Sequence, residues 1–158
     1  MLGEGEMAQW VAWKRATDRV WDAVAREITS ATGMSASEFA VLSRVVEGGG
    51  GRMRQGEIGQ LLGWQRPRLS RLLARMEGRG LVARTADGPG RVVIATAAGR
   101  DAVALARPAH ARAVRAALID LVPAGSADGF WAAIDAIGSA ENGRAPAPAG
   151  SSLTGADE

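Results

Sequence analysis

The first part of the chain has the apolar spacing of a long helix. From about residue 7 to about residue 31, side chains recur at alternating intervals of three and four, in a seam formed by Trp10, Trp13, Thr17, Val20, Val24 and Ile28. This spacing places the seam on one side of a helix. Gly33 predicts where that helix ends. Ser35, with Glu38 three residues later, predicts a capped second helix that runs to the glycines at 48–51.

Two short helices in tandem are predicted next. Residues 55–62 have helical apolar spacing, Gly63 and Trp64 interrupt it, and residues 66–79 resume it. Pro67 falls in the first turn of the second helix, where a missing N–H is tolerated. A helix, a tight glycine-containing turn and a second helix form the helix-turn-helix arrangement.

A β-hairpin and further helices complete the pattern. Residues 81–85 and 92–95 read as strands joined by a Gly/Pro turn at 87–90, and a hairpin directly after the second helix of such a motif is a wing. Thr96 begins another helix, in which Pro108 predicts a kink or a break. Residues 126–138 form a last amphipathic helix, and residues 141–158, rich in Pro, Ala, Gly and Ser, are predicted to be disordered.

Positive charge is concentrated in the middle of the chain. The 158 residues have a formal net charge of only +2, yet the stretch from Arg52 to Arg91 has nine basic and three acidic residues. The rest of the chain is therefore net negative. Clustering of this kind is typical of a surface that binds a polyanion such as DNA. The alternative is a solvated arginine face in a protein that uses arginine instead of lysine, since Lys14 is the one lysine.

The second helix of the motif has one apolar and one basic face. At about 100° per residue, Leu69, Leu72, Leu73 and Met76 share the face that must be buried. Arg71 lies nearly opposite, where it can read guanine in the major groove, and flanking arginine and serine side chains can hold phosphates. The predicted DNA-binding residues are Arg54, Gln65, Arg66, Pro67, Arg68, Ser70, Arg71, Arg75, Arg84, Asp87 and Arg91.

Several other classes of protein are disfavoured. The chain has no cysteine, which excludes disulfides, zinc-thiolate sites and thiol redox chemistry. His110, its one histidine, has no evident catalytic partner, and no spacing of acidic residues indicates a metal site, so we expect neither an enzyme nor a bound cofactor. The glycine run lacks the Gly-Lys-Ser/Thr of a phosphate loop. An acidic start and the lack of a long apolar run predict a soluble, cytoplasmic protein with no membrane association.

From "GEIGQLLGWQRPRLSRLLARMEGRGLVAR" through the hairpin to "TAAGR", the sequence resembles the MarR family of bacterial winged helix-turn-helix transcription regulators. The most specific part is the leucine-rich helix followed by "MEGRGLVAR", a short wing and "T-x-x-G". The family often has Asp-x-Arg-Arg in the wing, where this chain has "DGPGR"; Asp87 and Arg91 correspond to the acidic and basic positions, and the second arginine has no certain counterpart. The resemblance implies a homodimer that binds palindromic promoter DNA and releases it when a small molecule binds.

We therefore expect a mainly α fold with a small β-hairpin wing (α+β), a winged helix-turn-helix with flanking dimerisation helices. The expected parts are an N-terminal dimerisation helix (1–34), a DNA-binding domain (35–96), C-terminal dimerisation helices (97–140) and the tail (141–158). The apolar ends of the chain favour pairing with a second copy over packing within one chain, and a symmetric dimer calls for a pseudo-palindromic site.

The resemblance also implies an effector pocket between the dimerisation helices and the winged domain. A small apolar or aromatic effector is expected there, and the candidate residues are Trp13, Trp21, Phe39, Leu42, Arg107 and Arg112. Each of the aromatic side chains can equally be a core or interface residue. The predicted function is a homodimeric, sequence-specific regulator, a repressor released by its effector. The alternative is a winged-helix module that binds another protein instead of DNA.

Overall fold

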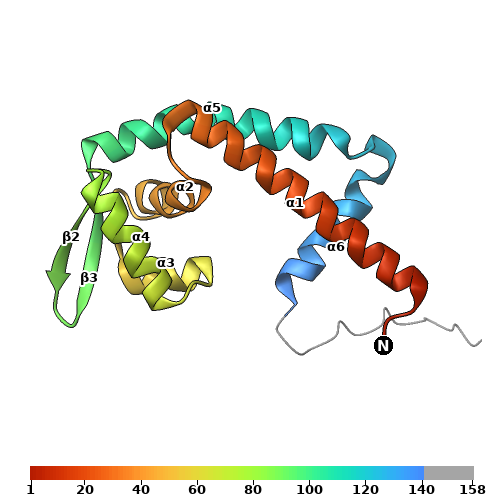
Figure 1. The fold of residues 1–158 in the computed structure, drawn as a ribbon, viewed down its shortest axis with the longest axis horizontal. Coiled ribbons are helices and arrows are strands. Elements are labelled where there is room, and N and C mark those ends of the chain that lie inside the picture. The colour runs from red at the N-terminus through yellow and green to blue at the C-terminus, as the bar shows by residue number, and fades with distance from the viewer. Residues whose placement is uncertain (141–158) are drawn as a thin grey trace, which may run out of the picture. The chain divides into compact units, whose positions relative to one another are not determined.

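The computed structural model, which describes residues 1–140, is mainly helical and contains a small antiparallel sheet, whose β2–β3 hairpin (residues 82–95) projects beside α4 (Arg66–Gly78) (Figure 1). Residues up to Asp120 form one compact unit, and residues 121–140 belong to a second. The first unit contains α1 (Glu4–Thr32), α2 (Ala36–Ser43), α3 (Gln55–Leu62), α4 (Arg66–Gly78) and α5 (Ala97–Ala117). The second contains α6 (Ala127–Ser139), in which the rings of Phe130 and Trp131 meet edge to face. The predicted tail, 141–158, lies outside the described residues.

The predicted capping box at the start of α2 is confirmed. The Ser35 hydroxyl accepts a hydrogen bond from the Glu38 backbone N–H at 3.2 Å, and the Glu38 carboxylate accepts one from the Ser35 backbone N–H at 2.8 Å. The helix then widens into a π-helical turn, Arg44–Gly48, before the glycine loop. The predicted second helix is therefore an α-helix followed by a π-helical turn.

The sheet has three strands, where the sequence pattern predicted two. The predicted hairpin is present as β2 (Val82–Asp87) and β3 (Gly90–Ala95), and β1 (Arg52–Arg54) pairs with the other edge of β3, so the order is β1-β3-β2. Met53 lies opposite Val93, and both are buried. The third strand escaped prediction because three residues are too few to show an alternating pattern, and its partner is about forty residues away in the sequence.

The start of α5 explains the Thr-x-x-Gly motif. The Thr96 hydroxyl accepts a hydrogen bond from the Gly99 N–H and donates one to the Gly80 carbonyl oxygen at 2.6 Å, which ties the helix to the end of α4. A side chain at position 99 would overlap the Leu81 carbonyl. The helix continues through Pro108 without the break that the proline could have caused; Pro108 is on its exposed side. Figure 1 shows α5 leading from the hairpin past α2, and it packs against α1.

One core joins these elements. It combines Val24 and Ile28 of α1, the apolar face of α4 and residues of α2, the sheet and α5. The four apolar residues predicted to be the inner face of α4 are all buried, at 3% exposure or less: Leu69, Leu72, Leu73 and Met76. The opposite face of α4 therefore points to solvent, and the prediction of its orientation is confirmed.

Candidate nucleic-acid interface

The turn between α3 and α4 sets the position of the basic helix. Gly63 ends α3 in the left-handed conformation, at φ 61°, and the Trp64 N–H then donates to the Gly59 carbonyl oxygen at 2.9 Å. Gln65 is the exposed N-cap residue of α4, and Pro67 lies in the first turn. The chain thereby passes from α3 to α4 within three residues, and the basic face of α4 stays outside the core.

The exposed face of α4 carries four arginines that have no ion-pair partner among residues 1–140. They are Arg66, Arg68, Arg71 and Arg75. Ser70, between them, is half-buried. The guanidinium carbon of Arg68 lies 4.1 Å from the centroid of the Trp64 ring, a cation–π contact. Arginine side chains without an ion-pair partner among residues 1–140 are therefore concentrated on the outward face of α4.

The arginine at the end of the same helix has a different environment. Arg79 donates to both carboxylate oxygens of Glu38, at 2.8 and 2.7 Å, and to the Gly33 carbonyl oxygen at 3.1 Å. Glu38 is only 5% exposed. Its burial acts to raise the pKa of Glu38, but hydrogen bonds from Ser35 and Arg79 outweigh it and hold the pKa below 4.5. Arg79 therefore links the end of α4 to the junction of α1 and α2.

Two of the predicted DNA-binding arginines also have acidic partners. Arg84 of β2 makes two side-chain hydrogen bonds to Glu77 of α4, at 3.0 and 2.7 Å, and its side chain is 11% exposed. These bonds lower the pKa of Glu77, although the weaker effect of desolvation opposes them. Arg54 of β1 pairs with Asp87 at 2.7 Å, and both side chains remain about half exposed. The first pair fixes the hairpin to α4, and the second fixes it to β1.

A groove lies between α3, the start of α4 and the hairpin. It has a volume of about 930 Å³, and its lining includes Gln55, Trp64, Arg66, Ser70 and Arg91. Arg91 stands on β3 opposite Ala86 and is exposed. Glu77 and Asp87 are paired with arginines of the chain, and the groove's lining within residues 1–140 has two arginines and no acidic side chain, so the groove and the face of α4 keep a positive charge. The predicted site residues Arg66, Ser70 and Arg91 thus line one groove, while Arg68, Arg71 and Arg75 lie on the adjoining face of α4.

The candidate effector residues fall at separate places. Leu42 is fully buried in the core, and Phe39 lies against His110 with ring centroids 5.2 Å apart. Arg107 pairs with Glu47 at 2.9 Å. Trp13 and Trp21 are 40% and 66% exposed on α1. The sequence could not place them together, because it does not reveal which sides of α1, α2 and α5 meet.

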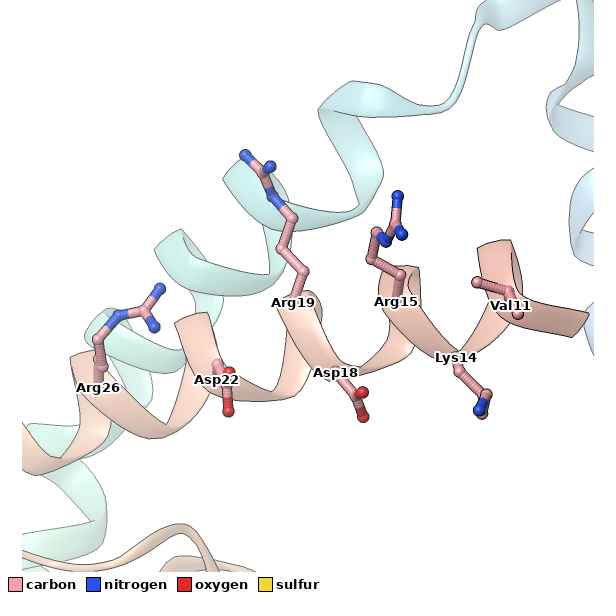
Figure 2. Close-up of a pocket in the computed structure, with 7 residues that line it drawn as sticks. All are labelled: Val11, Lys14, Arg15, Asp18, Arg19, Asp22 and Arg26. Atoms are coloured by element: carbon pink, nitrogen blue, oxygen red, sulfur yellow. The ribbon is translucent and has the colours of Figure 1, made fainter. Parts of the chain in front are cut away.

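Arg112, the remaining candidate, lies in a groove between α1 and α5. This groove has a volume of about 570 Å³, and Arg19 and Arg26 of α1 also line it. Figure 2 shows Arg19 and Arg26 on the same side of α1 as Arg15, while Asp18 and Asp22 project in another direction. Both acidic residues are exposed.

Comparisons with known proteins find a family model that matches part of the chain and solved structures with the same fold. A model described as MarR family matches residues 32–91. Sco3205, a MarR family transcriptional regulator from Streptomyces coelicolor crystallised with DNA, is 24% identical, with 87% of this chain and 88% of that chain covered and a TM-score of 0.79. AbsC, a MarR family regulator of the same organism, is 23% identical, with 87% and 95% covered and a TM-score of 0.79.

A third similar structure has a ligand. CouR from Rhodococcus jostii RHA1, bound to p-coumaroyl-CoA, is 22% identical, with 80% of this chain and 88% of that chain covered and a TM-score of 0.66. The search of curated proteins gives no match. Within residues 1–140, no helix is long and apolar enough to cross a membrane, and no group of three metal-binding side chains is present. The resemblance predicted from the sequence is confirmed: residues 32–91 match the MarR family, and the chain has the winged helix-turn-helix fold of its transcriptional regulators.

Proposed function

We propose that the protein is a sequence-specific regulator of transcription that binds double-stranded DNA. The observation that carries this proposal is the exposed face of α4, where four arginines, without acidic partners among residues 1–140, lie beside a positively charged groove. A helix with such a face fits the major groove, whose base edges arginine can read. Sco3205, which has the same fold, was crystallised with DNA. The chain would act where DNA is accessible, in the cytoplasm of a bacterium.

In the proposed complex, Arg71 contacts base edges and the flanks of α4 contact phosphates. Arg66 and Ser70 face the groove towards the hairpin, whereas Arg68 and Arg75 are on the other flank at about 100° per residue. Arg91 on the hairpin is placed to approach the minor groove, where a narrow width increases the negative potential. Arg54, Arg84 and Asp87 contribute indirectly, because their ion pairs hold the hairpin in place.

We propose a homodimer formed by the helices outside the winged domain. Three tryptophans on α1, Trp10, Trp13 and Trp21, are 48%, 40% and 66% exposed, and Leu105 on α5 is 60% exposed. Side chains of this size are normally buried in a partner or in a core. Two copies related by a two-fold axis would present two α4 helices about one DNA turn apart, ~34 Å, to a pseudo-palindromic site. Bound at a promoter, such a dimer would act as a repressor.

We further propose that a small aromatic effector weakens DNA binding. CouR and a neighbour crystallised with 2,4-dichlorophenol have this fold and bind aromatic compounds, which supports the ligand class. Phe39, partly buried against His110, and Arg112, in the groove between α1 and α5, are the candidate contacts. Titration of phenolic compounds, followed by tryptophan fluorescence and DNA release, tests this point. Unchanged DNA affinity across the panel would refute it.

The experiment for the main proposal is footprinting and binding on the intergenic DNA upstream of the gene. A scrambled duplex of equal length is the control, and both are measured across a salt series. We expect a protected pseudo-palindrome bound at least ~10³-fold more tightly than the scramble. Equal, salt-sensitive binding to both would refute specificity for this DNA, and no binding at low salt would favour the protein-interaction alternative.

A further inference from the structure

The turn of the helix-turn-helix contains a large aromatic residue that is not needed to make the turn. Gly63 supplies the left-handed conformation, and the backbone of Trp64 closes the turn through its hydrogen bond to Gly59. The indole is half-buried, with part of its surface against the core and part in the groove beside α4. It is therefore fixed by its surroundings and still reaches the DNA-facing surface.

The guanidinium of Arg68 rests on this fixed ring. The 4.1 Å between its central carbon and the ring centroid is much shorter than the 5.6 Å of the other cation–π contact within residues 1–140, Lys14 over Trp10. Arginine stacks on an aromatic ring through its flat face, so the N–H groups along its edge remain free to donate. Arg68 can consequently be held by Trp64 and contact a phosphate at the same time.

Pre-orientation matters for a long side chain. A free arginine loses rotamer freedom when DNA binding fixes it, and that loss weakens association. Arg75, on the same flank of α4, has neither an ion pair nor a cation–π contact among the described residues. The two arginines thus form a natural pair for comparison, one oriented in advance and one not.

We infer that Trp64 is a positioning residue for DNA binding, which holds Arg68 ready to contact a backbone phosphate. This inference rests on the proposed function, since it assigns one part of the same interface. It differs from a structural role of Trp64 in a measurable way. If Trp64 acts through Arg68, its replacement has no further effect once Arg68 is absent.

The test is a pair of double-mutant cycles on the footprinted duplex. Trp64→Leu should weaken binding about two- to five-fold, the range expected for an exposed cation–π contact. The salt slope should stay unchanged because the charge of Arg68 remains, whereas Arg68→Ala should lower the slope by about 1. Trp64→Leu added to Arg68→Ala should have no further effect. Added to Arg75→Ala, the control, it should retain its full effect.

Further measurements distinguish loss of the Trp64–Arg68 contact from loss of the fold, and failure of this inference from failure of the proposed function. Trp64→Phe, which keeps an aromatic face, should restore most of the affinity, and thermal unfolding checks that each variant is folded. In NMR spectra of the free protein, the Arg68 side-chain protons should show an upfield ring-current shift that Trp64→Leu removes. Full additivity of Trp64→Leu with Arg68→Ala, or the absence of that shift, would overturn the inference. If the shift is present but the wild type binds no DNA, the proposed function fails, and the positioning role fails with it.

Discussion

The exposed face of α4 and its C-terminal end use the same residue type in opposite ways. On the face, Arg71 and its neighbours have no acidic partner among the described residues. At the end, Arg79 has its charge matched by the buried Glu38 and donates a further hydrogen bond to a backbone carbonyl oxygen. A cluster of arginines is therefore not by itself a binding surface. Its partners decide which members are free for DNA and which hold the fold.

The largest expected effect is on the free energy of unfolding, at the C-terminal end of α4, where Arg79 pairs with Glu38. Glu38→Gln removes the charge that faces Arg79 and weakens the capping box. Breaking a buried pair costs about 3–5 kcal/mol, but Arg79 is partly exposed, so we expect a loss of about 2–3 kcal/mol in the free energy of unfolding. Chemical denaturation measures it. Glu57→Gln on the exposed surface of α3 is the control and should change the value by less than about 0.5 kcal/mol. Equal effects of the two would contradict the assignment.

The next effect is on DNA recognition, at the exposed face. Arg71→Ala should weaken binding to the footprinted duplex by about 1–3 kcal/mol and relax the base preference, because a bidentate contact to guanine is lost. Competition with duplexes substituted at each base pair measures both. Arg44→Ala, an exposed arginine of the π-helical turn, is the control for a lost positive charge and should leave the base preference unchanged. If Arg71→Ala binds as the wild type does, α4 is not the reading helix.

A smaller loss of DNA affinity, similar for all sequences, is expected from Arg75 on the flank of α4. Arg75→Ala should weaken specific and scrambled DNA by a similar factor, because a phosphate contact carries no sequence information. The slope of log K against log salt should fall in magnitude by about 1. Binding titrations at four or more salt concentrations give this slope. A loss confined to the specific duplex would instead make Arg75 a base-reading residue.

The smallest effect is a pH dependence of stability that belongs to the Glu38 pair. The pKa of Glu38 is lowered in the folded state, so its contribution is complete above the unfolded value of 4.5 and is lost as the pH falls through the folded value. Unfolding free energies measured between pH 6 and pH 3 should therefore decline less steeply for Glu38→Gln than for the wild type. Parallel curves would show that Glu38 does not contribute to the acid sensitivity.

The sequence predicted the local features of this molecule and missed the distant pairings. The inner face of α4 follows from helical spacing alone, and the capping box of α2 follows from two residues three apart. The Arg79–Glu38 pair joins residues 41 positions apart, and no periodicity reveals it. The ion pairs of Arg54 and Arg84 likewise depend on how β1, the hairpin and α4 pack. Charge clustering therefore indicated a positively charged surface but not which of its arginines are paired within the chain.

The division of the α4 arginines is tested most directly by the salt dependence of DNA binding in two variants, Arg71→Ala and Arg79→Ala. Both are measured on the footprinted duplex at a temperature where each is fully folded, with the active fraction determined by stoichiometric titration. We expect Arg71→Ala to lose about 5- to 150-fold in affinity, the equivalent of 1–3 kcal/mol, and Arg79→Ala to keep the wild-type affinity and salt slope. A loss in Arg79→Ala as large as that in Arg71→Ala, or no loss in either, would contradict the division.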